Sequence, residues 1–217
     1  MDSESFMKGR LITLEGGEGA GKTTALATVT RWLEENDRVV TLTREPGGTP
    51  PAEKIRALLL DPNTGDIDPL TELLLMFAAR AENLRQVIRP ALERGEDVVS
   101  DRFSDASMAY QGYGRGLGKM PINTLRQLVH ADLQPALTLL LDIPVEVGLE
   151  RIGKRDHQPD RFEQNNREFL ERVRQGYLDQ AAHSPERYRV IDASRPLDEV
   201  QTDIIQTLEN DLQNGSR

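Results

Sequence analysis

Short apolar segments alternate with longer amphipathic ones along the chain. The short segments are rich in Leu, Ile and Val and cover residues 11–14, 39–43, 97–100, 137–141 and 188–191. Such continuous apolar runs are typical of parallel strands buried on both faces. Apolar residues recur at helical spacing from Thr23 to the turn at Asn36, and again within 71–94, 121–131, 145–155, 162–182 and 197–210. The alternation predicts an α/β fold, with a sheet of about five parallel strands wrapped by helices on both faces.

The pattern contains no interdomain linker, internal repeat or low-complexity tract. A length of 217 residues suits one compact core, since single cores grow to about 200 residues before they split. We therefore expect a single domain over 9–213, preceded by a flexible polar tail at 1–8. Neither the tail nor any later stretch has the apolar run of a signal peptide or a membrane span.

Net charge and cysteine content limit the cellular compartment and the classes of partner that we expect for this protein. The formal net charge is −9, which argues against a protein that grips nucleic-acid backbones through clustered cations. The absence of cysteine excludes disulfides, thiolate zinc sites and thiol nucleophiles, and suits a reducing compartment. We expect a soluble, cytoplasmic protein that binds neither nucleic acid nor membrane.

A phosphate-binding motif follows the first predicted strand. The pattern G-x-x-x-x-G-K-[ST] is matched at every defined position by Gly16, Gly17, Glu18, Gly19, Ala20, Gly21, Lys22 and Thr23. In this strand-to-helix context, backbone N–H groups surround phosphate oxygens, the lysine adds a mobile charge, and the Thr23 hydroxyl is placed to coordinate Mg²⁺. The motif predicts ATP and Mg²⁺ as cofactors, with Thr24 as a further contact to the nucleotide.

The loop alone does not name a reaction, because GTPases, motors and transporter ATPases also carry it. The chain has neither the Asn-Lys-x-Asp guanine-reading tetrapeptide nor the Leu-Ser-Gly-Gly-Gln signature of transporter ATPases. It has instead Asp101-Arg102 directly after an apolar strand, where ligands of open α/β folds collect. There Asp101 can hold the metal or its waters and Arg102 can bridge two phosphates, whereas elsewhere the dipeptide would be an ordinary surface pair.

Three further segments resemble those of thymidylate kinases of the bacterial type. They read TREPGGT at 43–49, MFAAR at 76–80, and DRF at 101–103 followed by AYQG at 109–112. With the loop and the order of elements, the resemblance covers nearly the whole chain. It implies a P-loop nucleoside-monophosphate-kinase fold, transfer of the ATP γ-phosphoryl to dTMP to give dTDP and ADP for dTTP synthesis, and a homodimer packed through helices.

The resemblance also implies which residues hold dTMP, namely Arg44, Glu45, Pro46, Phe77, Arg80, Arg102, Ser107, Tyr110 and Gln111. Phe77 and Arg80 are three apart on a predicted helix, so the ring can stack on the pyrimidine while the guanidinium donates to its carbonyl edge. Phe77 also continues an apolar stripe, so a core position is the alternative. Tyr110 is expected to crowd the 2′ position and favour deoxyribose.

A lid is expected at about 150–162, where basic residues are mixed with Gly and Pro. The variable residues of the phosphate loop include no cation, and the resemblance implies that the lid then supplies it, from Arg155 and Arg161, with Arg151 next. A solvated charged face is the alternative. Glu18 is a further candidate for the metal, Ala193 lies in a turn like the family's adenine-contacting one, and the glycines at 112–118 predict a mobile loop.

The predicted catalytic set is therefore Lys22, Asp101, Arg102, Arg155 and Arg161. Three other interpretations compete with this one. Another small nucleotide or nucleoside kinase would prefer a different acceptor, and a P-loop ATPase that acts as a switch would hydrolyse ATP without any acceptor. An inert structural role would leave Lys22→Ala without biochemical consequence.

Overall fold

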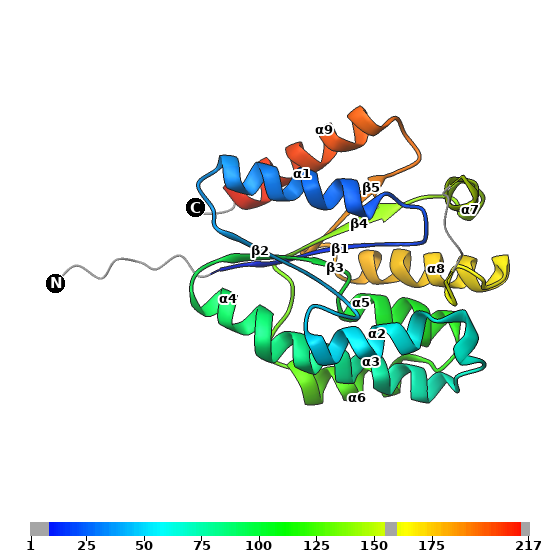
Figure 1. Cartoon of the computed structure of the whole chain (residues 1–217). Helices are drawn as coiled ribbons and strands as arrows, with labels where there is room; N and C mark the ends of the chain where they lie inside the picture. The colour runs from blue at the N-terminus through cyan, green and yellow to red at the C-terminus, as the bar shows by residue number, and fades with distance from the viewer. Residues whose placement is uncertain (1–8, 155–159, 214–217) are drawn as a thin grey trace.

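A computed structural model describes residues 9–154 and 160–213 (Figure 1). Its five strands form one parallel sheet in the order β2-β3-β1-β4-β5. The strands are β1 (Leu11–Gly16), β2 (Val40–Arg44), β3 (Asp97–Asp101), β4 (Leu137–Asp142) and β5 (Tyr188–Asp192). Each coincides with a predicted strand, so the α/β prediction is confirmed. The tail expected at 1–8 lies outside the described residues.

Helices cover both faces of the sheet (Figure 1). One face carries α1 (Lys22–Glu35) and α9 (Leu197–Leu208), which a π-helix (Glu209–Gln213) extends. On the other side lie α2 (Pro50–Leu60), a 3₁₀ turn (Pro62–Thr64), α3 (Pro69–Asn83), a π-helix (Leu84–Ile88), α4 (Arg89–Glu93), α5 (Ser104–Ser107), η3 (a π-helix, Met108–Gly114), α6 (Lys119–His130) and α8 (Arg167–His183). The helix α7 (Val145–Gly153) follows β4. No helix in the described ranges is long and apolar enough to cross a membrane.

The central strands are buried on both faces because successive side chains point to opposite sides. Leu139 and Leu141 of β4 pack with α1 and α9, for example against Val29. Leu140 between them packs with α8, for example against Tyr177. Each fully buried apolar side chain contributes about 1.5–3 kcal/mol. The sheet is thereby a firm base for the loops at its carboxyl edge.

One helix begins later than predicted, and another was not predicted. The helix expected at 162–182 begins at Arg167, because the Asn166 side chain accepts a hydrogen bond from the Phe169 N–H at 2.9 Å and caps it there. The helix α2 was not predicted. Thr49 caps it by accepting from the Ala52 N–H at 3.3 Å, and proline occupies its first turn.

The prediction of a mobile loop at 112–118 is wrong for residues 112–114, which belong to a helix. Gly112 and Gly114 are buried in η3, which packs along α8. A Cβ on Gly114 would lie 2.7 Å from the Phe169 ring. The glycines therefore permit close packing here.

Candidate active site

The phosphate loop joins the end of β1 to the start of α1. Gly21, with φ 87°, precedes the helix without any side-chain cap, which leaves the first-turn N–H groups available to an anion. Gly19 has φ 73°, and a Cβ there would lie 2.3 Å from the Gly148 carbonyl oxygen on α7. A residue here must adopt a positive φ and must lack a Cβ, and only glycine does both.

Lys22 lies over this loop. Its Nζ donates to the carbonyl oxygens of Gly16 at 3.2 Å and Gly17 at 3.1 Å. Burial, and then the neighbouring Arg102, lower the pKa of Lys22. A lysine that donates to uncharged backbone carbonyls is available to a phosphate group.

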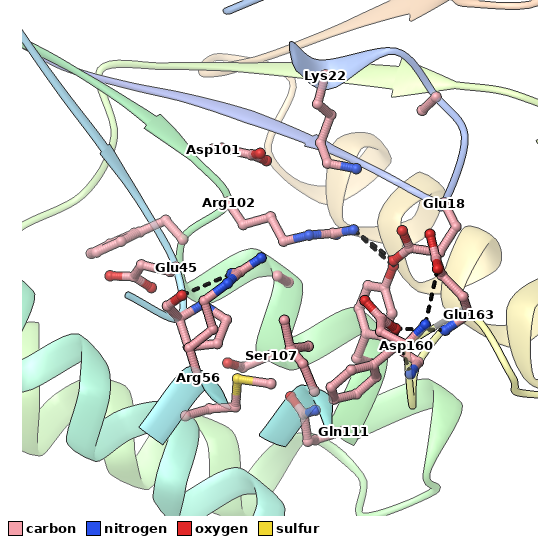
Figure 2. A pocket seen from close by; sticks show the side chains of 18 of the residues that line it. Glu18, Lys22, Glu45, Arg56, Asp101, Arg102, Ser107, Gln111, Asp160 and Glu163 are labelled. Carbon is pink, nitrogen blue, oxygen red and sulfur yellow. Dashed lines mark hydrogen bonds and ion pairs between the residues drawn. The ribbon is translucent and has the colours of Figure 1, made fainter. Parts of the chain in front are cut away.

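Arg102 connects β3 to the phosphate loop, as Figure 2 shows. Its backbone has φ 70°, a conformation that costs about 1–3 kcal/mol and is found at functional sites. Nη1 donates to the Gly16 carbonyl and the Tyr177 hydroxyl, each at 2.9 Å. Nη2 donates to Glu18 at 2.8 Å and to the Tyr110 hydroxyl at 3.0 Å. The guanidinium is thus fixed beside the loop.

A cavity of about 250 Å³ opens in front of Lys22. The structure brings most of the predicted site residues to it: Glu18, Gly19, Ala20, Gly21, Lys22, Thr23, Glu45, Pro46, Arg80, Asp101, Arg102, Ser107, Tyr110 and Gln111. They come from the phosphate loop, the ends of β2 and β3, the helix α3 and the α5–η3 helical segment. Residues far apart in sequence therefore form one charged, partly aromatic pocket.

Arg80 pairs with Glu45 on the wall of this cavity. Its Nε donates to Glu45 at 2.6 Å, and Nη2 donates to the Phe103 carbonyl and the Ser107 hydroxyl, each at 3.1 Å. Nη1 has no partner among the described residues. Burial raises the pKa of Glu45, and Arg80 opposes that rise. A buried guanidinium with an unused donor is suited to an oxygen of a ligand.

The family model for thymidylate kinases matches residues 14–204. The chain belongs to the thymidylate kinase family. A thymidylate kinase of Ectopseudomonas mendocina (strain ymp) is 56% identical over 198 residues, 91% of this chain and 94% of that protein. One from Pseudomonas syringae pv. tomato (strain ATCC BAA-871 / DC3000) is 52% identical over 211 residues, 96% of this chain and 100% of that protein. The enzyme therefore uses ATP to phosphorylate dTMP to dTDP.

The base-stacking role predicted for Phe77 needs correction. Its side chain is 2% exposed and does not line the cavity. It packs in the core, with its ring parallel to that of His130 at a centroid distance of 6.3 Å, and with the Arg80 Cζ 4.4 Å above it. Its neighbour Met76 lines the cavity instead. The Phe77 ring packs against the Arg80 guanidinium.

Two predicted arginines also lie away from the cavity. The Arg44 side chain is 53% exposed and pairs with Glu53 at 3.0 Å. Arg161 donates to the Leu59 carbonyl at 2.7 Å and to Glu72 at 2.5 Å. Neither lines the cavity, so the acceptor-binding role of Arg44 and the catalytic role of Arg161 stay predictions. Arg155 lies outside the described residues.

A second cavity lies on the other side of the phosphate loop. It is lined by Gly19, Ala20, Gly21, Thr24, Arg151 and Ala193, together with residues of α9. Arg151 donates to the Ala193 carbonyl at 3.0 Å, which ties α7 to the turn after β5. The turn predicted to contact adenine therefore borders a pocket that shares the phosphate loop with the first, and Arg151, expected as a lid cation, lines this second pocket and not the main cavity.

Sequence reasoning missed Arg56, which reaches the main cavity from α2. Its Nη1 donates to the Pro46 carbonyl at 2.9 Å, and burial and then Arg44 lower its pKa. The Thr-Pro start of α2 was the signal that a helix follows the second strand. Only the packing of that helix shows that Arg56 faces the cavity. Asp160, near the end of the expected lid, and Glu163, just after it, also line the cavity and were missed.

Proposed function

We propose that dTMP occupies the main cavity and that ATP occupies the phosphate loop and the second cavity. The main support for this proposal is that Gly19, Ala20 and Gly21 line both cavities. Two nucleotides bound in this way meet end to end at Lys22 and Arg102. Such alignment supplies most of the rate enhancement in phosphoryl transfer.

The phosphate of dTMP is held by Arg56 and Arg102 in this proposal. Lys22 and Arg56 hydrogen-bond backbone carbonyls, whereas Arg80 and Arg102 pair with Glu45 and Glu18. The charges of Arg80 and Arg102 are therefore offset by carboxylates more than those of Arg56 and Lys22. Because Lys22 belongs to the phosphate loop, Arg56 is the natural partner of the acceptor phosphate.

Arg56→Met tests this arrangement, with Lys54→Met, an exposed cation on the same helix, as the matched control. We expect Arg56→Met to raise KM for dTMP about 100-fold, the loss of one charged hydrogen-bonded contact of 2–3 kcal/mol, and to change KM for ATP little. Lys54→Met should change neither. A rise confined to the ATP KM would show that the nucleotides are assigned to the wrong cavities.

The base lies between Arg80 and Gln111, and the sugar lies against Tyr110. Arg80 offers its unused Nη1 to a carbonyl of the pyrimidine. Met76 and Phe103 supply apolar walls of the same cavity. Tyr110 is held by its hydroxyl, which donates to Glu18 at 2.6 Å, so a rigid ring excludes bulk at the 2′ position.

Mg²⁺ fits beside the phosphate loop. Asp101 lines the cavity with Thr23, and its Oδ1 is buried without a hydrogen-bond partner among the described residues. A carboxylate and a hydroxyl are hard oxygen donors, and Mg²⁺ is commonly held by few protein groups with nucleotide phosphates completing its shell. When bound, the ion would offset phosphate charge. Asp101→Asn should therefore raise the Mg²⁺ concentration needed for half-maximal activity at least tenfold.

Glu18, the third candidate for the metal, fits the acceptor side better. Its Oε1 accepts from Arg102 and from Tyr110, so this oxygen orders the acceptor pocket. An anionic dTMP oxygen needs no strong general base, and Lys22 and Arg102 neutralise the charge of the transferred group. Whether Arg155 joins them stays a prediction.

We also propose a homodimer that packs through α3 and α6. Leu70 and Leu74 on α3 are 47% and 49% exposed, and Met120 and Leu128 on α6 are 76% and 78% exposed. Large exposed apolar side chains gathered on neighbouring helices mark interaction surfaces. Sedimentation should show a dimer at micromolar concentration that Leu128→Glu dissociates. A wild-type monomer would contradict this.

A further inference from the structure

A buried carboxylate lies directly behind the base-binding wall. Glu72 on α3 is 0% exposed and is not among the residues that line the cavity. It accepts from the Gln111 side-chain nitrogen at 2.8 Å, from Arg115 at 3.2 Å and from Arg161 at 2.5 Å. Of these three donors, only Gln111 lines the cavity.

The surroundings of Glu72 decide which way the Gln111 amide faces. A glutamine side chain has one donor end and one acceptor end. The guanidinium groups of Arg115 and Arg161 can only donate, so both carboxylate oxygens of Glu72 act as acceptors here. Gln111 must therefore present its NH₂ group to Glu72. Its carbonyl oxygen, Oε1, is then the end left for a ligand in the cavity.

We propose that Glu72 is a specificity-determining positioning residue, which selects pyrimidines that carry a hydrogen on N3 by fixing the Gln111 amide with its oxygen toward the base. This inference rests on the proposed placement of dTMP in the main cavity. Glu72 would influence base recognition through Gln111, without contacting the substrate itself.

The selection follows from the edges of the bases. Thymine and uracil present a carbonyl oxygen at C4 and an N–H at N3, which match the donor Nη1 of Arg80 and the acceptor Oε1 of Gln111. Cytosine presents an amino group at C4 and an unprotonated N3, so both contacts would be mismatched. A site with two polar groups left unpaired rejects such an analogue strongly.

Glu72→Gln tests the proposal, because a neutral amide can offer either end to Gln111 and so no longer fixes its orientation. The readout is the ratio of kcat/KM for dUMP to that for dCMP, two substrates that differ only at the edge in question. We expect the ratio to fall at least tenfold in Glu72→Gln. The control Glu82→Gln makes the same change on the same helix, where Glu82 pairs with exposed Arg85, and should leave the ratio unchanged.

The exchanged pair Glu72→Gln/Gln111→Glu provides a second variant. Its carboxylate at position 111 can only accept, so it meets N3–H while Gln at position 72 donates to it, and the ratio should return toward the wild-type value. An unchanged ratio in Glu72→Gln, even with both activities equally reduced, would overturn the proposal and leave Glu72 a structural residue. A wild-type enzyme with no preference for dUMP over dCMP would instead refute the placement of the base, and this proposal with it.

Discussion

Replacing Arg80 by Met should both destabilise the protein and impair the use of dTMP. The side chains of Arg80 and Glu45 are 2% and 3% exposed, and Oε1 of Glu45 has no hydrogen-bond partner among the described residues. Arg80 is therefore the main compensation for a buried negative charge. Breaking such a pair from one side costs about 3–5 kcal/mol.

The loss should depend on pH with a definite sign. Burial raises the pKa of Glu45 above its ordinary value of 4.5. The buried carboxylate therefore costs stability once it ionises, and stability falls as pH rises above about 4.5. Arg80 opposes this rise. Without Arg80 the folded-state pKa of Glu45 rises further, and Arg80→Met should be more destabilised relative to wild type at pH 8 than at pH 5.

Urea unfolding at pH 5 and pH 8 measures the loss of stability and its pH dependence, and KM for dTMP measures the impaired use of the substrate. The double variant Arg80→Met/Glu45→Gln should recover most of the stability, because no charge is then stranded. Arg85→Met, an exposed arginine just beyond α3, should change stability by less than about 0.5 kcal/mol. If Arg80→Met lost the same free energy at both pH values, or less than about 1 kcal/mol, the reasoning about a stranded carboxylate would be refuted.

Three further predictions concern the phosphate loop and the strand before it. Lys22→Met should lower kcat about 10²–10³-fold in a coupled ADP assay, with little change in the thermal midpoint; retained turnover would contradict its role. Glu15 is fully buried and its pKa is raised to about 8, by burial first and then by Asp105, so its ionisation removes stability as pH rises from about 4.5 to 8. The thermal midpoint of Glu15→Gln should therefore rise relative to that of the wild type between pH 6 and pH 9. A difference that stays constant with pH would disprove this. Gly19→Ala should weaken ATP binding, measured by titration calorimetry, because its Cβ would lie 2.3 Å from the Gly148 carbonyl.

The sequence predicted those features that depend on neighbouring residues along the chain. The five strands follow from short apolar runs, and the phosphate loop follows from glycine spacing between a strand and a helix. Asp101 and Arg102 were placed at the sheet edge because they directly follow a strand. Local order suffices in these cases, since parallel strands end at one common edge.

Tertiary structure alone decided which side chains of a helix face the cavity. Met76 and Phe77 are adjacent on α3, yet Met76 lines the cavity and Phe77 packs in the core. Successive helical residues point about 100° apart, and only the packing of α3 against its neighbours sets which direction is inward. The carboxylate of Glu72 likewise meets Gln111 and Arg161, 39 and 89 residues away. No periodicity in a single sequence encodes such contacts, because they arise only when separate elements are brought together.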